Sequence, residues 1–299
     1  MDVVVIGSVN RDISVMAPRL PRPGETVTGT GHFYGPGGKG ANQAVAAACL
    51  GAEVAMVGRI GDDEHGASLV EGLRRAGVDA TGIGVDDRAG TGIAVITIDN
   101  RAENTIVISP GANMELAPHH IEACHDLVAG AAVVLAQLEI PMDTVLAAAG
   151  ITSGLFCLNP APAEPMPAEL LERVDVLVPN RSELGVLAGV DEPGTAAEAV
   201  AIARRLRHQG PTVITLGADG AVIVDGDESE IFPAPEIEPV DPTGAGDAFC
   251  GALATMLAWG RELERAVPWA VAAGAAAVTR RGAQTAMPTI DEVETLLSE

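Results

Sequence analysis

Short apolar runs recur along the chain and alternate with longer stretches that have the composition of helices. Strands buried on both faces are apolar throughout, so continuous runs of Val, Leu and Ile are typical of a parallel sheet covered by helices. The runs are residues 3–6, 54–57, 133–137, 155–158, 174–178, 213–216 and 221–224. The predicted helices are residues 41–50, 66–76, 142–149, 196–209, 248–259 and 266–279. We therefore expect a three-layer α/β/α fold with a mostly parallel central sheet.

Two segments interrupt this pattern. Residues 11–40 are rich in Pro and Gly, and residues 91–109 contain the apolar runs 92–98 and 105–108 on either side of a polar turn, which predicts a β-hairpin. We expect both segments to form a small β-sheet lid on an α/β core made of residues 1–10, 41–90 and 110–299. An exposed apolar face on such a sheet would favour a homodimer.

The chain is strongly acidic, with a net charge of -23 at pH 7. Nucleic-acid backbones are bound by basic surfaces, and the aromatic residues that stack on bases make up only 2% of this chain. We therefore expect no nucleic-acid partner. The same acidity repels a free nucleotide anion, so a nucleotide site in this chain would need a divalent cation and local hydrogen-bond donors.

The cysteines and the first residues of the chain indicate a cellular compartment. Cys49, Cys124, Cys157 and Cys250 show no C-x-x-C spacing and lie in apolar surroundings, as expected of buried thiols in a reducing compartment. The first apolar run is far shorter than the ~18 residues that a membrane span needs, and no basic segment precedes it. We therefore expect a soluble, cytoplasmic protein without a membrane partner.

The segment from Asp241 to Asp247 reads Asp-Pro-Thr-Gly-Ala-Gly-Asp and comes directly before a predicted helix. Gly244, Ala245 and Gly246 allow backbone N–H groups to converge at the start of that helix, where the helix dipole attracts anions. A helix N-terminus would keep the carboxylate of Asp247 ionised and able to accept a proton. An anion site with a base beside it indicates a group-transfer reaction.

A second glycine-rich loop spans residues 35–43 and includes Lys39, the only lysine in the sequence. The loop matches G-x-G-x-x-G, but no strand of convincing length precedes it, so a dinucleotide fingerprint lacks its context. It is not a Walker A loop either, because Gly40 occupies the place of the Ser or Thr that binds magnesium. The compact ammonium of Lys39 would fit a small polyol pocket, and Asn42 would lie beside it at the start of a helix.

Polar residues follow two of the predicted strands at their carboxyl ends, where ligands bind in open α/β sheets. Asn10 and Asp12 follow the first strand and, being two residues apart, point to the same side of an extended backbone. Glu139 follows the run that ends at residue 137. An Asx-turn at Asn10 and a structural carboxylate at Glu139 are the alternatives.

Two further strand ends are candidates for nucleotide binding. Asn180 and Glu183 have the spacing of a helix capping box, but they also suit a site near nucleotide phosphates and hydrated Mg²⁺, which retains waters and few protein carboxylates. The other strand end leads into a glycine turn, which is either an ordinary hairpin or a nucleotide-binding shelf. Its residues are Thr215, Leu216, Gly217, Ala218, Asp219 and Gly220.

Taken together, these residues resemble the ribokinase-like carbohydrate kinases of the PfkB family over the whole length of the chain. Residues 37–44, Gly-Gly-Lys-Gly-Ala-Asn-Gln-Ala, resemble the N-terminal signature of that family, and residues 241–247 resemble its C-terminal signature. Residues 7–12, 23–27, 159–163 and 281–284 are similar to segments of the ribokinases within it. Each signature is specific, and both occur in the family's order.

The resemblance implies ATP-dependent phosphorylation of D-ribose at its 5-hydroxyl. Asp247 would take the hydroxyl proton, and the N–H groups of Gly244, Ala245 and Gly246 would stabilise charge on the transferring phosphoryl group. The residues implied to hold the sugar are Asn10, Asp12, Gly38, Lys39, Asn42, Glu139 and Asp247. Those implied to contact ATP are Asn180, the turn from Thr215 to Gly220, Gly246, Asp247 and Val271.

The resemblance also implies two metal ions. Glu183 would lie near hydrated Mg²⁺, and a monovalent cation, K⁺, would bind near the anion site mostly through carbonyl oxygens. The positions that match its ligands are Asp241, Thr243, Ala277, Arg280, Gly282 and Ala286. Ala286 departs from the pattern, because ribokinases can have a serine there whose hydroxyl is missing in this chain.

Two alternative functions remain open. Within the kinase class, the substrate could be deoxyribose, another pentose or a nucleoside, although Asn10, Asp12, Lys39 and Asn42 favour a free sugar rich in hydroxyls. From another class, the chain could be a catalytically silent sugar-binding regulator. The presence of Asp247 beside an intact glycine cradle argues against a regulator, because a binding protein needs no base.

Overall fold

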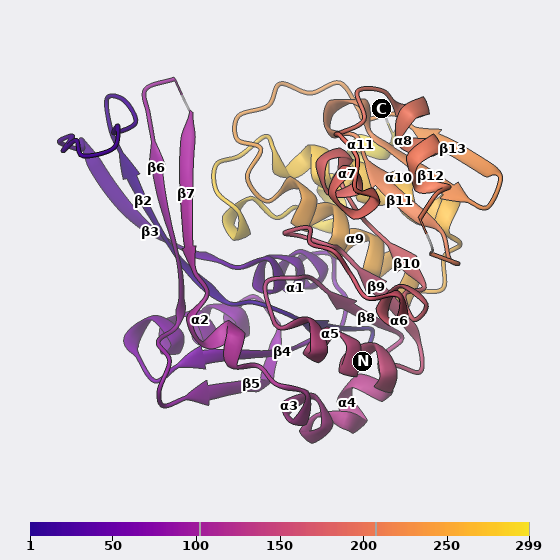
Figure 1. Ribbon diagram of the computed structural model, residues 1–299, viewed down its shortest axis with the longest axis horizontal. Coiled ribbons are helices and arrows are strands. Elements are labelled where there is room, and N and C mark those ends of the chain that lie inside the picture. The colour runs from indigo at the N-terminus through magenta and orange to yellow at the C-terminus, as the bar shows by residue number, and fades with distance from the viewer. Residues whose placement is uncertain (102, 207, 299) are drawn as a thin grey trace.

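The computed structural model describes residues 1–101, 103–206 and 208–298, and its main element is a nine-stranded sheet (Figure 1). The strand order is β13-β12-β11-β10-β9-β8-β1-β4-β5. Neighbours from β11 to β5 pair in parallel, whereas β12 and β13 are added antiparallel at one edge. In this order the strands span Glu228–Phe232, Ala221–Asp225, Thr212–Thr215, Val176–Leu177, Leu155–Leu158, Val133–Ala136, Val3–Ile6, Val54–Gly61 and Asp79–Asp86.

Helices cover both faces of this sheet, because alternate side chains of its strands point to opposite sides. In β1, Val3 and Val5 pack in one hydrophobic cluster, and Val4 and Ile6 pack in another. The first cluster includes α1 (Lys39–Cys49), α2 (Glu64–Arg75), α9 (Ala245–Ala258), α10 (Leu263–Ala277) and α11 (Ile290–Ser298). The opposite layer contains α3 (Pro118–Ala123), α4 (His125–Ala129), α5 (Met142–Ile151), α6 (Ala168–Leu171), α7 (Arg181–Ala188) and α8 (Ala196–Ala203). The predicted three-layer α/β/α fold is confirmed.

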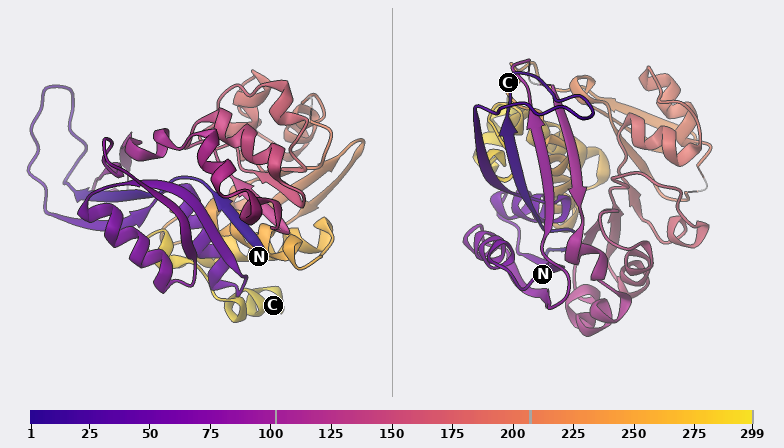
Figure 2. Two further views of the ribbon diagram at one scale, coloured as in Figure 1. Left: turned by 90° about the horizontal axis from the view of Figure 1, so that it is seen from below. Right: turned by 60° about the vertical axis from the view of Figure 1, so that its left-hand side comes forward.

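A separate four-stranded sheet extends from one side of the core (Figure 1). Its order is β3-β2-β6-β7, with β3 at Gly31–Gly37, β2 at Asn10–Met16, β6 at Gly92–Ile98 and β7 at Asn104–Ser109. The antiparallel pairing of β6 with β7 confirms the predicted hairpin. The connection between β2 and β3, residues 17–30, reaches farthest from the core (Figure 2). That these strands act as a lid stays a prediction.

The strand that leads into the glycine-rich loop was not expected. β3 runs through Gly35, Pro36 and Gly37 and is followed almost directly by α1, so the expectation that no convincing strand precedes Lys39 was wrong. β3 lies at the edge of its sheet, where Pro is tolerated and side chains remain exposed, and it therefore lacks an apolar run. It pairs antiparallel with β2, which is still not the βαβ context of a dinucleotide fingerprint.

Other element boundaries also differ from the expectations. β5 and β13 were not predicted, because β5 contains two glycines and β13 is mostly exposed and polar at its sheet edge. α8 ends at Ala203 rather than at residue 209. Within the described residues, no helix combines the length and the apolar character that crossing a lipid bilayer would require.

Candidate active site

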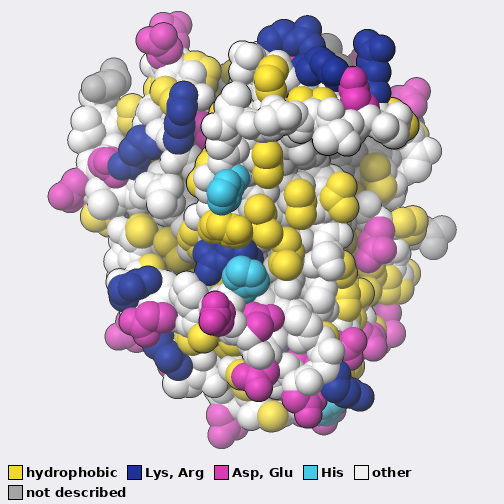
Figure 3. Space-filling view, turned by 90° about the vertical axis from the view of Figure 1, so that its left-hand side faces the viewer, with side chains coloured by type: hydrophobic (Ala, Val, Ile, Leu, Met, Phe, Trp, Pro, Cys, Tyr) yellow, Lys and Arg dark blue, Asp and Glu magenta, His cyan; other side chains and the backbone are white. Residues whose placement is uncertain are grey.

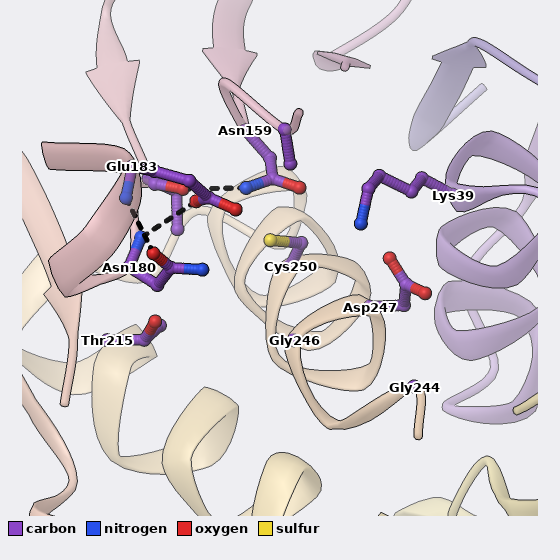
Figure 4. A pocket seen from close by; sticks show the side chains of 11 residues that line it. Lys39, Asn159, Asn180, Glu183, Thr215, Gly244, Gly246, Asp247 and Cys250 are labelled. Carbon is purple, nitrogen blue, oxygen red and sulfur yellow. Dashed lines mark hydrogen bonds between the residues drawn. The ribbon is translucent and has the colours of Figure 1, made fainter. Parts of the chain in front are cut away.

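A cavity of about 220 Å³ lies at the N-terminus of α9 (Figure 4). It is lined by Lys39, Asn159, Ala161, Val178, Asn180, Glu183, Thr215, Gly244, Gly246, Asp247 and Cys250. These residues come from α1, from the carboxyl ends of β9, β10 and β11, and from the first turns of α7 and α9. The structure therefore brings predicted sugar, nucleotide and catalytic residues to one site.

Glycine is required where the chain enters α9. Gly244 is the N-cap residue with a φ of 80°, and a Cβ on it would lie 3.0 Å from the Cα of Ala283. The N–H of Ala245 donates to the carbonyl of Pro242 at 3.3 Å. Among the described residues, the N–H groups of Gly244, Gly246 and Asp247 have no acceptor, so these donors remain available to an anion.

Asp247 lines the cavity and is only 8% exposed. Its Oδ2 accepts from Asn42 Nδ2 at 2.8 Å, and its Oδ1 accepts from Gln43 Nε2 at 3.0 Å. Burial raises the pKa of Asp247, while Lys39 and the two amide donors act in the opposite direction. A buried carboxylate whose pKa is raised is suited to accept a proton near neutral pH.

Close packing of α1 against α9 places both amide donors on this carboxylate. A Cβ on Gly251 of α9 would lie 2.6 Å from the Cβ of Ala46 in α1, so the two helices approach at a glycine. Asn42 was predicted to hold the sugar, and here its Oδ1 also accepts from Gln284 Nε2 at 3.1 Å. Gln43 was not predicted as a site residue, although it lies within the N-terminal signature.

Lys39 is the first residue of α1, and its ammonium points across the cavity toward Asp247 (Figure 4). Burial alone would lower the pKa of Lys39, but the carboxylates of Asp247, Glu139 and Glu183 outweigh this effect and raise it. The backbone N–H of Lys39 donates to Glu139 Oε2 at 3.1 Å, and Ser8 Oγ donates to the same oxygen. Lys39 is therefore a permanently charged group facing the base.

The predicted sugar residues Asn10 and Asp12 are on β2 and lie against the glycines of β3. A Cβ on Gly37 would lie 2.1 Å from Asp12 Oδ1, and Gly38 has a φ of 90° and passes close to the backbone of Asn10. Burial and then the charge of Glu139 raise the pKa of Asp12 to about 6. Arg11 acts on the pKa of Asp12 in the opposite direction. Asp12, Glu139 and Asp247 therefore form a cluster of carboxylates that Arg11 and Lys39 only partly offset.

Asn113, which sequence reasoning missed, fixes the orientation of Asn10. It lies in the 3₁₀ helix Gly111–Glu115, where the chain leaves β7, and it is almost completely buried. Its Oδ1 accepts from the N–H of Val9 at 2.9 Å, and its Nδ2 donates to Asn10 Oδ1 at 2.7 Å. Because Asn10 Oδ1 accepts this hydrogen bond, the N–H groups of the Asn10 amide point away from Asn113. No sequence signal links residues so far apart.

Asn180 and Glu183 form the predicted capping box and also line the cavity. The N–H of Glu183 donates to Asn180 Oδ1, and the N–H of Asn180 donates to Glu183 Oε2, both at 2.8 Å. Burial raises the pKa of Glu183, and the hydrogen bond from Asn180 acts in the opposite direction. The capping and binding interpretations are therefore compatible, because Glu183 uses only one of its two carboxylate oxygens, Oε2, in the cap.

The predicted nucleotide turn joins β11 to β12, which are antiparallel neighbours. Thr215 lines the cavity beside Asn180, with which it forms a β-bridge. Leu216 and Gly220 are buried, whereas Gly217, Ala218 and Asp219 are exposed, and Asp219 forms an ion pair with Arg181. Val271 is buried on α10 and is not part of the cavity wall.

The predicted ligands of a monovalent cation lie in two neighbouring segments at the C-terminal end of α10. Asp241 Oδ1 accepts from the N–H of Thr243 at 3.0 Å, and its Oδ2 accepts from the N–H of Gly282 at 2.9 Å. These bonds lower the pKa of Asp241 although burial opposes them. The carboxylate is therefore ionised and holds the two segments together.

The remaining three positions lie in the same region. The carbonyl of Ala277 accepts from the N–H of Arg280 at 3.4 Å, and the carbonyl of Ala286 accepts from Arg280 Nη2 at 3.2 Å. All these candidate ligand atoms are oxygens, which suit a hard cation such as K⁺. Ala286 is fully buried and adds no side-chain oxygen to the set.

Comparisons with known proteins show the family to which the chain belongs. The model of the pfkB family of carbohydrate kinases matches residues 1–290. The ribokinase of Bacillus subtilis is 38% identical over 300 residues, covering 99% of both chains, and the deoxyribokinase of Salmonella typhi is 34% identical over 304 residues, covering 100% of this chain and 99% of its own. The solved structure of Arabidopsis thaliana ribokinase complexed with ribose and ATP superposes with a TM-score of 0.91 at 33% identity, covering 99% of this chain and 98% of that chain. The chain therefore belongs to the PfkB family of carbohydrate kinases.

Proposed function

We propose that the chain is a cytoplasmic ribokinase that phosphorylates D-ribose at O5 with ATP. The observation that carries this proposal is the buried Asp247 carboxylate in the cavity at the start of α9. The cavity also contains the ammonium of Lys39 and N–H groups of α9 that have no acceptor among the described residues. A base, an anion site and a fixed positive charge are what phosphoryl transfer to a hydroxyl needs. The ribokinase among its relatives and the ribose and ATP complex of a similar structure support this substrate pair.

The reaction follows from the positions of these groups. Asp247 accepts the proton of the 5-hydroxyl as O5 forms a bond to the γ-phosphorus, and the bond from that phosphorus to the β-γ bridging oxygen breaks to release ADP. The N–H groups of Gly244 and Gly246 stabilise charge on the equatorial oxygens. Lys39 stabilises the negative charge that accumulates between the two substrates. Closure of the predicted lid over the sugar would exclude water that could otherwise accept the phosphoryl group.

Glu183 and the segments around Asp241 fit the two implied cations. Glu183 uses Oε2 to cap α7, which leaves its Oε1 for the water shell of Mg²⁺. The bound ion would supply charge neutralisation on the ATP phosphates. The oxygens of Asp241, Thr243, Ala277, Arg280, Gly282 and Ala286 would hold K⁺ behind the anion site. We propose that K⁺ bound by these oxygens would activate the enzyme, because Asp241 and Thr243 belong to the segment that leads into α9.

A coupled assay with ribose, ATP and Mg²⁺ tests the proposed activity. We expect turnover with ribose and slower turnover with deoxyribose, because the polar groups of Asn10, Asp12 and Lys39 would lose hydrogen-bond partners with a sugar that lacks a hydroxyl. The deoxyribokinase relative makes deoxyribose the second candidate substrate. An enzyme that prefers deoxyribose would reverse the assignment of substrate but not of reaction, and no turnover with either sugar would contradict both.

Replacing Ala286 by Ser is expected to lower the K⁺ concentration needed for half-maximal activity by a few-fold. The substitution adds a hydroxyl oxygen at a buried position whose carbonyl is already among the candidate ligands. The measurement is kcat as a function of KCl at constant ionic strength, with tetramethylammonium chloride as the replacement salt. An unchanged K⁺ response in a stably folded variant would argue that this position does not face the cation.

We propose that the four-stranded sheet is the interface of a homodimer. Hydrophobic side chains gather on this side of the molecule (Figure 3), and Tyr34, Val95 and Val107 are exposed by 58%, 44% and 70%. The strand registers place these three side chains in one row with Ile13, so they share one face of the sheet. An apolar face of this kind favours association with a second copy of the chain.

Val107→Asp is expected to convert the dimer to a monomer, because it places a charge at the most exposed apolar position of this face. Light scattering coupled to size-exclusion chromatography measures the mass directly. Val190→Asp is the matched control, since Val190 is also exposed but lies beyond α7 on the core. A wild-type chain that is monomeric at all concentrations would refute the interface.

A further inference from the structure

Behind the Asp247 carboxylate lies a chain of buried amide side chains that the proposed reaction does not itself require. Gln43 and Gln137 are completely buried, and Asn159 is 9% exposed. Gln43 Nε2 donates both to Asp247 Oδ1 at 3.0 Å and to Asn159 Oδ1 at 3.1 Å. Gln137 Nε2 donates to Gln43 Oε1 at 2.6 Å. The chain therefore connects the end of β8 to the base through α1.

The direction of every amide in this chain is determined by its ends. Asn159 Nδ2 donates to the carbonyl of Val178 at 2.9 Å, and a carbonyl can only accept, so Asn159 must present its Oδ1 to Gln43. Gln43 then faces two acceptors, Asn159 and Asp247, and must present its N–H groups to both. Its Oε1 is left for Gln137, which must donate in turn.

This arrangement leaves Gln137 Oε1 without a hydrogen-bond partner among the described residues. The atom is enclosed by the backbone of Gly7, where a Cβ would lie 2.0 Å from it. A buried acceptor without a partner destabilises a fold, and an apolar side chain of similar size would avoid that cost. The contact that distinguishes this amide from an apolar side chain is the hydrogen bond that its Nε2 donates to Gln43.

We propose that Gln43 is a positioning residue for the base, and that Gln137 fixes the direction in which the Gln43 amide presents its N–H groups to Asp247. The proposal rests on the proposed function, in which Asp247 accepts the proton of the sugar. Asn42 and Gln43 hold one oxygen of the carboxylate each, which fixes its plane relative to the cavity. A flipped Gln43 amide would instead place an oxygen against the carboxylate.

Besides the amides of Asn42 and Gln43, several charged or titratable groups interact with the Asp247 carboxylate. Lys39 favours the ionised carboxylate and Glu139 opposes it. Asp12, Glu183 and the Cys250 thiol also interact electrostatically with Asp247. Because carboxylates outnumber the ammonium here, neutral N–H donors are needed to keep the buried base ionised without adding charge.

The test replaces the two glutamines of this chain by an apolar side chain of similar size, in the variants Gln43→Met and Gln137→Met. In Gln43→Met we expect kcat to fall roughly 10-fold or more with a smaller change in the KM for ribose, because a hydrogen bond to a charged group is lost. We also expect the acid limb of the kcat profile to move to higher pH. Gln137→Met, which removes no contact to Asp247, should shift both quantities in the same direction by less.

Thr144→Val is the matched control for a merely structural effect. Thr144 is fully buried on α5 and donates from Oγ1 to the carbonyl of Leu116, and neither residue lines the cavity. We expect this variant to lose thermal stability while it keeps the wild-type kcat and acid limb. Gln43→Met with a wild-type kcat and pH profile would overturn the proposal, and a wild-type profile in Gln137→Met alone would overturn the role of Gln137.

A second readout does not depend on turnover. In protein labelled with ¹³C at aspartate Cγ, the Asp247 resonance is assigned by its loss in Asp247→Asn, and its titration midpoint is compared between the wild type and both methionine variants. The midpoint should rise in Gln43→Met and, by less, in Gln137→Met. Unchanged midpoints in both would contradict the proposal even in an active enzyme. A wild-type chain that fails to phosphorylate ribose would refute the proposed function while leaving this comparison valid.

Discussion

Asp247→Asn is expected to lower kcat by at least ~10²-fold while ribose binding changes much less. The amide cannot accept the proton of the 5-hydroxyl, so the loss falls on the step in which O5 attacks the phosphoryl group. In addition, Asn42 and Gln43 both donate to the carboxylate, and an amide has only one acceptor oxygen to offer them. Steady-state kinetics gives kcat, and calorimetric titration with ribose in the absence of ATP gives the binding constant.

The folded state should survive this substitution. Burial raises the pKa of Asp247, so the ionised carboxylate is a destabilising group at neutral pH, and its removal offsets part of the lost hydrogen bonding. Thermal unfolding should therefore show no large decrease in the melting temperature. Asp225→Asn, at the exposed end of β12, removes a carboxylate elsewhere and should leave kcat unchanged. An Asp247→Asn enzyme with wild-type kcat would exclude this residue as the base.

The parallel core could be predicted because its strands are buried on both faces. Val3, Val4, Val5 and Ile6 are all fully buried, and such a run is visible in the sequence without knowledge of its neighbours. β3 could not be predicted in the same way. Residues 31–34 of β3 are exposed, and the segment forms a strand because its backbone pairs with β2 along its whole length. Edge strands depend on their partners more than on their composition.

The site could be predicted as a set of residues but not as a set of contacts. Lys39, Asn180, Glu183 and Asp247 follow recognisable turns and helix starts, and the fold brings them to one cavity. Gln137 and Asn113 carry no local signal, and the signature that contains Gln43 does not say what Gln43 contacts, because an amide in an apolar stretch looks the same whether it binds a base or fills the core. Their roles depend on partners such as Asn10, which Asn113 contacts across 103 residues of sequence.

The affinity for ribose is expected to fall as the pH decreases below 6. Burial and the charge of Glu139 raise the pKa of Asp12 to about 6, so the carboxylate is ionised above this pH and accepts hydrogen bonds from sugar hydroxyls. Protonation removes that acceptor, and the dissociation constant should rise by up to about tenfold for each further pH unit. Calorimetric titration with ribose between pH 5 and 8 measures it, in the Asp247→Asn background so that the base does not titrate.

Asp12→Asn separates this effect from a general loss of structure in acid. The variant should bind ribose weakly at pH 8 and show little change down to pH 5, because its amide does not titrate. The fold itself does not weaken through Asp12 as the pH falls: a carboxyl whose folded pKa of about 6 exceeds its unfolded value of 3.8 binds protons more tightly when folded, so its contribution to stability increases below pH 6. The same loss of affinity in Asp12→Asn as in its parent would therefore assign the pH dependence to a group other than Asp12.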